Sequence, residues 1–111
     1  MVLVHYWATW CEPCKEDLKT LHDLHSKYGR RGFALIGVNL DTNKPDLDGF
    51  LRQNRLPWPQ IFEGGGLDSR LAVEMGIFNL PTMILIDPQG NVLSRNLHVS
   101  ELEAELRKRI R

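Results

Sequence analysis

Two cysteines, Cys11 and Cys14, are the residues whose type and spacing point most directly to chemistry. They are the only cysteines in the 111-residue chain, which excludes a framework of several disulfide bonds. They can form one local disulfide, supply half of a metal site, or remain unused thiols. Residues i and i+3 on the first turn of a helix lie about 5–6 Å apart, which matches the Cα separation of a disulfide. The spacing therefore permits reversible closure with little movement of the backbone.

The helix that we expect to begin after Cys11 favours redox chemistry at this pair. The first backbone N–H groups of a helix have no partner within it, and the helix dipole is positive at this end. A thiolate at the cap position accepts those hydrogen bonds, so the pKa of Cys11 should be lowered and Cys11 should be the nucleophile. We expect Cys14, one turn further, to be more buried and to act as the resolving thiol.

A metal site is the weaker interpretation of the cysteine pair. A structural zinc ion needs four ligands, and the chain offers two thiols. His22 lies about 12 Å further along the helix than Cys14, too far to share an ion with it. His22 and His25 could hold a metal weakly by themselves, but we expect them to lie on a helix surface. We therefore predict no metal site.

A strand, a helix and a second strand must position the cysteines. Residues 2–8 are mostly apolar and predict a buried strand, and residues 33–40 predict another. Between them, residues 12–28 carry apolar side chains at helical spacing, and Gly29 is the expected stop. The two strands should be parallel, with a right-handed crossover.

The middle of the chain predicts an insertion. Pro45 suits the first turn of a helix, and the prolines on either side of Trp58 require extended backbone. A short helix should begin at Asp68 or Ser69 and end at Gly76. Trp58 is expected to pack in the core.

The last third of the chain predicts two strands and a helix. Residues 82–87 and 91–97 flank a tight turn and should form an antiparallel hairpin. Ser100 and Glu103 are placed as a capping box for a final helix. The element order indicates an α/β protein with a central mixed sheet flanked by helices, and with an αβ-type insertion between its βαβ and ββα halves.

Composition and charge narrow the class of protein. The chain is 42% hydrophobic and 25% charged, which suits one soluble globular domain over residues 1–111. Its 14 basic and 14 acidic residues balance, so charge offers no argument for a nucleic acid partner. No apolar run is long enough to span a bilayer. Because the buried strand starts at residue 2, we expect the domain to be cut from the C-terminal part of a longer chain.

Residues 7–15 (WATWCEPCK) resemble the signature of the thioredoxin superfamily. The Glu-Pro filling between the cysteines, the strand end at Val38 and the helical insertion before Leu80-Pro81 are similar to the TlpA/ResA-like branch. The resemblance runs along nearly the whole chain and implies a thioredoxin fold. It also implies that Pro81 is a cis-proline facing the dithiol, and that Leu80 offers backbone groups to an extended substrate. From the residues alone, a plain turn at Pro81 would be the simpler interpretation.

Four further residues are expected to tune the site. Thioredoxins carry a buried aspartate where this chain has His5, so His5 either relays protons to the resolving cysteine or is a core histidine without a catalytic part. Glu12 should raise the pKa of the Cys11 thiol. Pro13 suits the first helical turn and removes one N–H donor from the thiolate. Trp10 should be an exposed aromatic wall of the site, whereas Trp7 belongs to the core.

The resemblance implies a thiol–disulfide oxidoreductase that reduces the disulfides of partner proteins. Its partner would be an apocytochrome or an assembly factor, with electrons from an upstream membrane reductant. We expect an extracytoplasmic domain, tethered through a segment absent from this chain, and a monomer as the default for this fold. No bound cofactor is required, because the dithiol itself carries two electrons. The alternatives are a disulfide oxidant or isomerase, and a redox-quiet module that binds a partner or copper.

Overall fold

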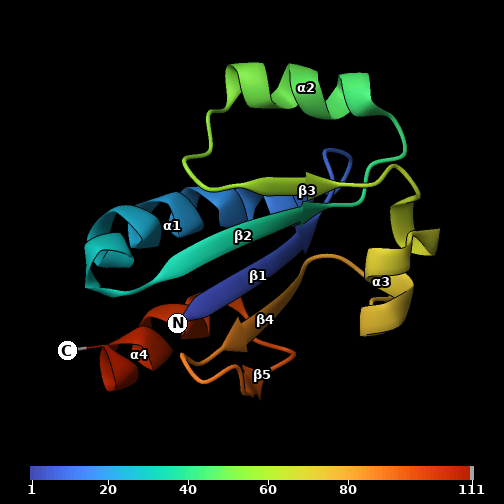
Figure 1. Ribbon diagram of the computed structural model, residues 1–111. Helices are drawn as coiled ribbons and strands as arrows, with labels where there is room; N and C mark the ends of the chain where they lie inside the picture. The colour runs from blue at the N-terminus through green and yellow to red at the C-terminus, as the bar shows by residue number, and fades with distance from the viewer. Residues whose placement is uncertain (111) are drawn as a thin grey trace.

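Five strands form one mixed sheet in the computed structural model, which describes residues 1–110 (Figure 1). The order across the sheet is β3-β2-β1-β4-β5. β2 is parallel to both β1 and β3, whereas β4 is antiparallel to β1, and β5 to β4. The strands are β1 (Val2–Trp7), β2 (Ala34–Asn39), β3 (Gln60–Phe62), β4 (Thr82–Ile86) and β5 (Val92–Ser94).

β1 and β2 lie next to each other in the interior of the sheet, as their apolar sequences predict. They pair in register, from Val2 opposite Ala34 to Trp7 opposite Asn39. The helix that connects them, α1, spans Glu12–Tyr28 and agrees with the predicted helix. Because the two strands are parallel, their carboxyl ends meet at the same edge of the sheet.

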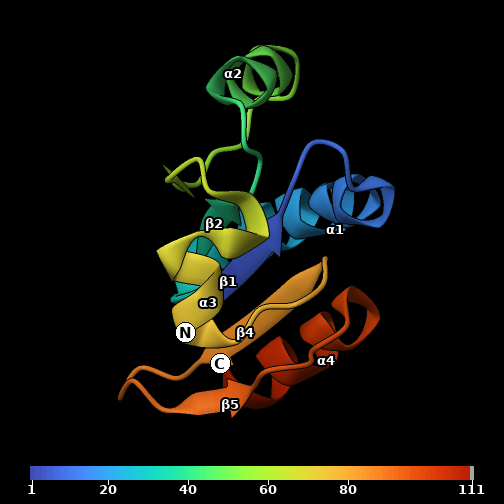
Figure 2. The same ribbon diagram turned by 90° about the vertical axis from the view of Figure 1, so that its right-hand side faces the viewer.

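Helices cover both faces of the sheet. α1 and α4 (Val99–Arg109) pack on one face, and α3 (Arg70–Met75) packs on the other (Figure 2). α2 (Lys44–Gln53) lies beyond the β3 edge and adds Leu47 to the core of the α1 face (Figure 1). Among residues 1–110, no helix is both long and apolar enough to cross a membrane.

Two hydrophobic cores fix these layers. The larger one joins α1 and α4 to the sheet, and the predicted apolar stripes of both helices are buried in it. The smaller one holds α3 against Tyr6 and Ile84. The buried stripe residues are Leu18, Leu21, Leu24 and Tyr28 of α1, and Leu102 and Leu106 of α4, followed by Ile110.

The helix α1 ends at Tyr28 with Gly29 as its C-cap, as predicted, but a turn that was not predicted follows it. Gly29 keeps a right-handed helical backbone, and the chain tightens into a 3-10 turn over Gly29–Arg31. The left-handed backbone that ends this turn lies at Gly32, whose φ is 98°. A residue with a Cβ is strained at that angle, so Gly32 ends the 3-10 turn, whereas Gly29 caps α1 as predicted.

The cap of α4 differs from the prediction. The capping residue is His98, not Ser100. The Ser100 N–H donates to Nδ1 of His98 (3.2 Å), and the His98 N–H donates to the Glu101 carboxylate (3.2 Å). The predicted box of Ser100 and Glu103 was therefore wrong, because a histidine ring nitrogen took the place of the expected hydroxyl.

The strands at the two edges are short. β3 has three residues and was not predicted as a separate strand, although an αβ-type insertion was expected. β5 occupies three residues of the predicted run 91–97, and its register against β4 shifts between Leu85 and Ile86. The position of each edge strand is set by the strand with which it pairs, β2 for β3 and β4 for β5.

Candidate active site

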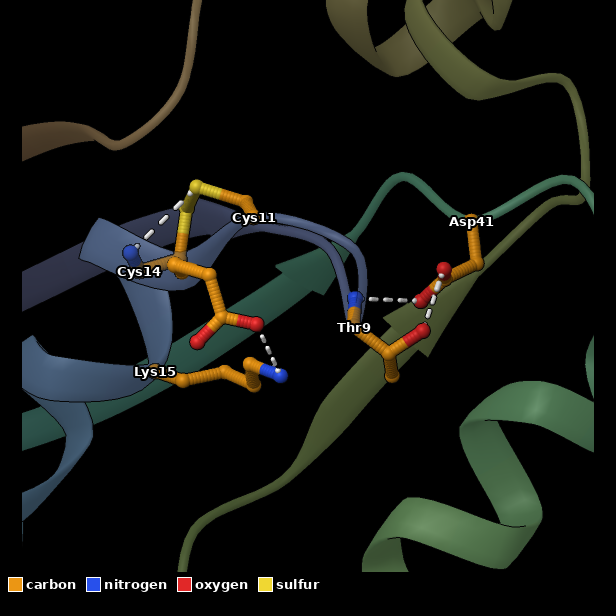
Figure 3. Close-up of polar contacts among 6 residues, drawn as sticks. Thr9, Cys11, Cys14, Lys15 and Asp41 are labelled. Carbon is orange, nitrogen blue, oxygen red and sulfur yellow. Dashed lines mark hydrogen bonds and ion pairs between the residues drawn. A yellow bond between two sulfur atoms is a disulfide. The ribbon is translucent and has the colours of Figure 1, made fainter.

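Cys11 and Cys14 lie where β1 leads into α1 (Figure 3). Cys11 is the N-cap of α1 and has an extended backbone. The Cys14 N–H donates to Sγ of Cys11 at 3.3 Å. The two residues form a disulfide with their Cα atoms 5.3 Å apart, within the range that the spacing predicts. The chain can thus close and open this bond at one helical turn.

The two sulfurs differ in accessibility. Cys11 is 6% exposed, whereas Cys14 is fully buried. Trp10 precedes Cys11 and is 60% exposed, so it forms an open aromatic surface next to the site. An incoming disulfide can therefore reach Cys11 before Cys14.

The residues between the cysteines lie on the first turn of α1. Pro13 occupies the first turn and has no N–H to offer a thiolate. The carboxylate of Glu12 is exposed and pairs with Nζ of Lys15 at 2.8 Å (Figure 3). Lys15 therefore offsets part of the negative charge that Glu12 brings near Cys11.

Asp41 holds the loop that carries Cys11. Its carboxylate accepts from the Thr9 N–H (3.0 Å) and from the Thr9 hydroxyl (2.7 Å) (Figure 3). It also accepts from Nδ2 of Asn39 at 2.7 Å, and its own N–H donates to Oδ1 of Asn39 at 3.0 Å. Asp41 is buried, so these bonds fix the backbone two residues before Cys11.

Asp41 was not predicted as a site residue, although the sequence carries a signal for it. Asn39 and Asp41 are the first polar residues after the buried run of β2. Since the carboxyl ends of parallel β1 and β2 meet, polar residues there face the loop that leaves β1. Thr9, the residue after the end of the predicted strand 2–8, was the available partner.

His5 lies at the centre of the sheet, opposite Gly37 of β2 and Met83 of β4. Its side chain is fully buried, and neither ring nitrogen has a hydrogen-bond partner among the described residues. Burial lowers the pKa of His5 from 6.5 to about 4, because water no longer stabilises the charged ring. The ring stacks at 6.4 Å from that of Trp7, which is also buried.

Leu80 and Pro81 lie immediately before β4, and the peptide bond between them is cis. Tyr6 pairs with Thr82, so Pro81 sits beside the end of β1 from which the cysteine loop departs. Leu80 is half-buried and contacts both hydrophobic cores. The fold thus brings Leu80-Pro81 to the same end of the sheet as the dithiol.

The two histidines of α1 pack against an aromatic side chain. The ring centroids of His22 and His25 lie 6.3 and 5.5 Å from that of the buried Trp58. Within residues 1–110, no three His, Cys, Asp or Glu side chains are grouped so that they could hold a metal ion.

A Cys-x-x-Cys disulfide at the start of α1, at the same end of the sheet as a cis-proline before β4, defines a thioredoxin-fold domain with a redox-type dithiol. Residues 1–92 match the family described as thioredoxin-like, and the chain belongs to this family.

Relatives agree with this class. The chain is 30% identical over 92 residues to thiol-disulfide oxidoreductase ResA of Bacillus thuringiensis subsp. konkukian, covering 83% of this chain and 51% of that protein. It is 27% identical over 93 residues to sporulation thiol-disulfide oxidoreductase A of Bacillus subtilis, covering 81% of this chain and 54% of that protein. The chain spans about half the length of these curated relatives.

A solved structure shows the same fold. A thiol-disulfide oxidoreductase from Bacteroides fragilis superimposes with a TM-score of 0.87 at 31% identity, covering 96% of this chain and 79% of that one. The mixed five-stranded sheet and its flanking helices are therefore those of the TlpA/ResA-like thioredoxin fold.

Proposed function

We propose that this domain reduces disulfides of partner proteins by thiol–disulfide exchange at Cys11 and Cys14. The observation that carries the proposal is the place of Cys11 at the N-cap of α1, where its sulfur accepts the Cys14 N–H. A thiolate in this place is stabilised by that bond and by the positive end of the helix dipole. The names of the relatives support the same chemistry.

The exchange proceeds in two balanced steps. The Cys11 thiolate attacks one sulfur of the partner's disulfide, which forms a mixed disulfide and releases the other partner sulfur as a thiolate. Cys14, after losing its proton, attacks Sγ of Cys11 and releases the second partner thiolate. Two electrons pass from the domain to the partner, and both partner thiolates take up protons from water. The dithiol carries these electrons without a bound cofactor.

The partner segment is expected to dock beside Pro81. Leu80 offers backbone N–H and C=O groups to an extended chain, as in strand addition. Pro81 has no N–H and does not compete for the sulfurs. The exposed ring of Trp10, the residue before Cys11, supplies an apolar contact for the same segment.

Glu12 and Pro13 are expected to keep the domain from being strongly oxidising. A carboxylate near Cys11 disfavours the thiolate, and Pro13 withholds one donor from it. A dithiol is a strong oxidant when its reduced form is stabilised. Glu12 and Pro13 both reduce that stabilisation.

His5 is proposed as a proton carrier for Cys14. Both of its ring nitrogens lack a hydrogen-bond partner among the described residues, so the neutral ring has a nitrogen free to take a proton. Burial lowers the pKa of His5 to about 4, which makes the ring a weak base, so the proposed transfer is transient. We expect His5→Ala to slow resolution of the mixed disulfide, measured by stopped-flow tryptophan fluorescence across pH. Turnover that stays unchanged across pH would show that His5 is a core residue without a catalytic part.

The reduction potential of the Cys11–Cys14 pair tests the direction of exchange. The domain is equilibrated in graded dithiol and glutathione buffers, and the redox state is read from tryptophan fluorescence, since Trp10 adjoins Cys11. A value below about −230 mV supports a reductant, whereas a value near −120 mV would identify an oxidant. Absence of any reversible transition would instead favour a module that binds a partner or copper.

The cellular location of the domain is proposed from the resemblance to the TlpA/ResA-like branch. We propose an extracytoplasmic domain that receives electrons from a membrane reductant and passes them to an apocytochrome or an assembly factor. Labelling of Cys11 in intact cells by a membrane-impermeant maleimide, after reduction, tests the compartment. Labelling that requires cell lysis would contradict it.

A further inference from the structure

A groove runs between α1 and the segment that links α2 to β3. It consists of two adjoining hollows of about 450 and 690 Å³ that share His22 on their walls. One wall is formed by α1 and the turn after it, from Lys15 to Arg30, and the other by residues 50–59, with residues 33–35 also lining the second hollow. We refer to the two hollows together as the α1 groove.

The floor of the α1 groove is apolar. Leu18 of α1, Phe50 of α2 and Leu56 line the first hollow, and Trp58 with Phe33 lines the second. Phe50 and Leu56 are only partly buried, so they remain in contact with solvent. Apolar area of this kind favours side chains of a partner over water.

The rim of the α1 groove is positively charged. Lys15, Lys19, Arg30 and Arg55 line it, against a single acidic residue, Asp23. Lys15 is paired with Glu12, but Lys19, Arg30 and Arg55 form no ion pair within residues 1–110. The formal net charge of the whole chain is zero, so this concentration of positive charge is local.

The lining of the α1 groove begins one residue after the cysteine pair along α1, and neither cysteine belongs to it. Lys15 follows Cys14 directly on α1, and the α1 residues that line the groove follow Lys15 in sequence. A chain whose disulfide reaches Cys11 can therefore lay a neighbouring segment into the groove. The disulfide and the segment in the groove would belong to one partner molecule. Contact at one of the two places therefore raises the effective concentration of the partner at the other.

We propose that the α1 groove binds an acidic segment of the partner protein that carries apolar side chains at intervals. Its carboxylates pair with Lys19, Arg55 and Arg30, and its apolar side chains lie on Phe50 and Leu56. The contact selects the partner and speeds encounter, because complementary charge steers association. This inference rests on the proposed exchange reaction for its purpose, but the binding itself does not depend on the redox state.

Binding is tested with a probe that lacks cysteine. A fluorescein-labelled peptide of alternating Glu and Leu is titrated with the domain, and anisotropy gives the affinity. The same peptide with Lys in place of Glu is the control of opposite charge. We expect the acidic peptide to bind at least about tenfold more tightly, with an affinity that falls as ionic strength rises.

Variants locate the contact. Lys19→Glu with Arg55→Glu should weaken binding of the acidic peptide by about tenfold or more. Lys44→Glu with Lys108→Glu changes the net charge equally but lies outside the α1 groove, so it should change the affinity little. If the two pairs of substitutions weaken binding equally, the effect is one of net charge and the proposal is wrong. Lys19→Gln with Arg55→Gln provides a milder version of the same test.

Kinetics separate this proposal from the proposed function. The reduced domain reacts with hydroxyethyl disulfide, which is uncharged, and with glutathione mixed disulfides of the acidic and basic peptides bearing one added cysteine. The groove variant should match the wild type on the neutral disulfide and lose its preference for the acidic peptide. A domain that binds the acidic peptide but reduces no disulfide overturns the exchange reaction and not the groove. Equal rates for both peptides, or tighter binding of an oligothymidine than of the acidic peptide, would overturn the groove.

Discussion

At the scale of single residues, Asp41 shows how a buried carboxylate can serve a redox site without touching it. It accepts both hydrogen bonds that Thr9 can donate to it, one from the backbone and one from the hydroxyl. Asn39 adds a third, which leaves both carboxylate oxygens occupied. The loop before Cys11 is therefore held by a residue that follows β2 and lies 32 positions away in sequence from Thr9.

Replacing Asp41 by Asn should loosen that loop. An amide presents an NH₂ group where N–H and O–H donors converge, so at least one buried donor loses its acceptor. We expect the free energy of unfolding in urea to fall by about 1–3 kcal/mol. Alkylation of Cys11 by iodoacetamide should also slow in the reduced domain, since the thiolate is less well held against the start of α1. Asp48→Asn on the exposed side of α2 is the control, and equal behaviour of the two variants would contradict the role of Asp41.

His5 should make stability depend on pH. Its pKa is about 4 in the fold and 6.5 when solvated, so between these values the unfolded chain binds a proton that the folded chain does not. The contribution of His5 is fully present above pH 6.5 and is lost as pH falls toward 4, by on the order of 3 kcal/mol.

The variant His5→Leu isolates this effect. It removes a ring with two unpartnered nitrogens from the core, so we expect it to be at least as stable as the wild type at pH 7. Urea unfolding at several pH values should show a smaller loss of stability for His5→Leu than for the wild type on acidification. Parallel curves for the two proteins would mean that His5 keeps an ordinary pKa in the fold.

At the scale of elements, the N-termini of α1 and α4 solve the same problem with different side chains. Each helix start leaves backbone N–H groups without a partner inside the helix. The sulfur of Cys11 accepts one of them in α1, and the imidazole of His98 accepts one in α4. The first arrangement would serve chemistry as well as stability, because the acceptor is the sulfur that we propose as the nucleophile.

His98→Ala should destabilise α4 by about 1 kcal/mol, the usual loss for a missing cap. Ser100→Ala should cost less, because the Ser100 hydroxyl contacts the His98 ring but caps no N–H. Chemical denaturation of both variants at neutral pH checks the order. A greater loss of unfolding free energy for Ser100→Ala than for His98→Ala would mean that Ser100 is the cap, as the sequence pattern predicted.

At the scale of the whole molecule, α4 closes the core on the face that α1 covers. Leu102 and Leu106 are fully buried in the larger core. At the surface, Glu103 accepts from Lys27 and from the Tyr28 hydroxyl, which joins α4 to α1. Burial and a surface ion pair therefore both connect the last helix to the rest.

Burial is the larger of these two contributions. We expect Leu106→Ala to lower the free energy of unfolding by about 2–5 kcal/mol, through lost burial and the cavity left behind. Glu103→Gln should cost much less, because water and salt screen a pair at the surface. Equilibrium unfolding of both variants shows which substitution lowers the free energy of unfolding more. A decrease for Glu103→Gln as large as that for Leu106→Ala would contradict the larger contribution of burial.

Much of this architecture follows from local sequence. The apolar runs of β1 and β2, the stripe of α1 and the glycine after α3 each act through neighbours a few residues away, so their patterns predict them. The edge strands of the sheet cannot be predicted from local sequence in this way. Gln60 begins β3 because Gly37 of β2 leaves room for its side chain, and the Trp7 indole N–H donates to that side chain at 2.8 Å. No pattern within residues 60–62 contains that information.

The chemistry of the site was determined by the sequence alone, because two cysteines three residues apart at a helix start meet within one turn whatever the rest of the chain does. What the tertiary structure decided is the setting of that pair. Asp41 reaches Thr9, Pro81 comes to the end of β1, and His5 loses its water only because strands distant in sequence pair in one register. Pairing between distant strands depends on the burial of the whole sheet, and no local spacing encodes it.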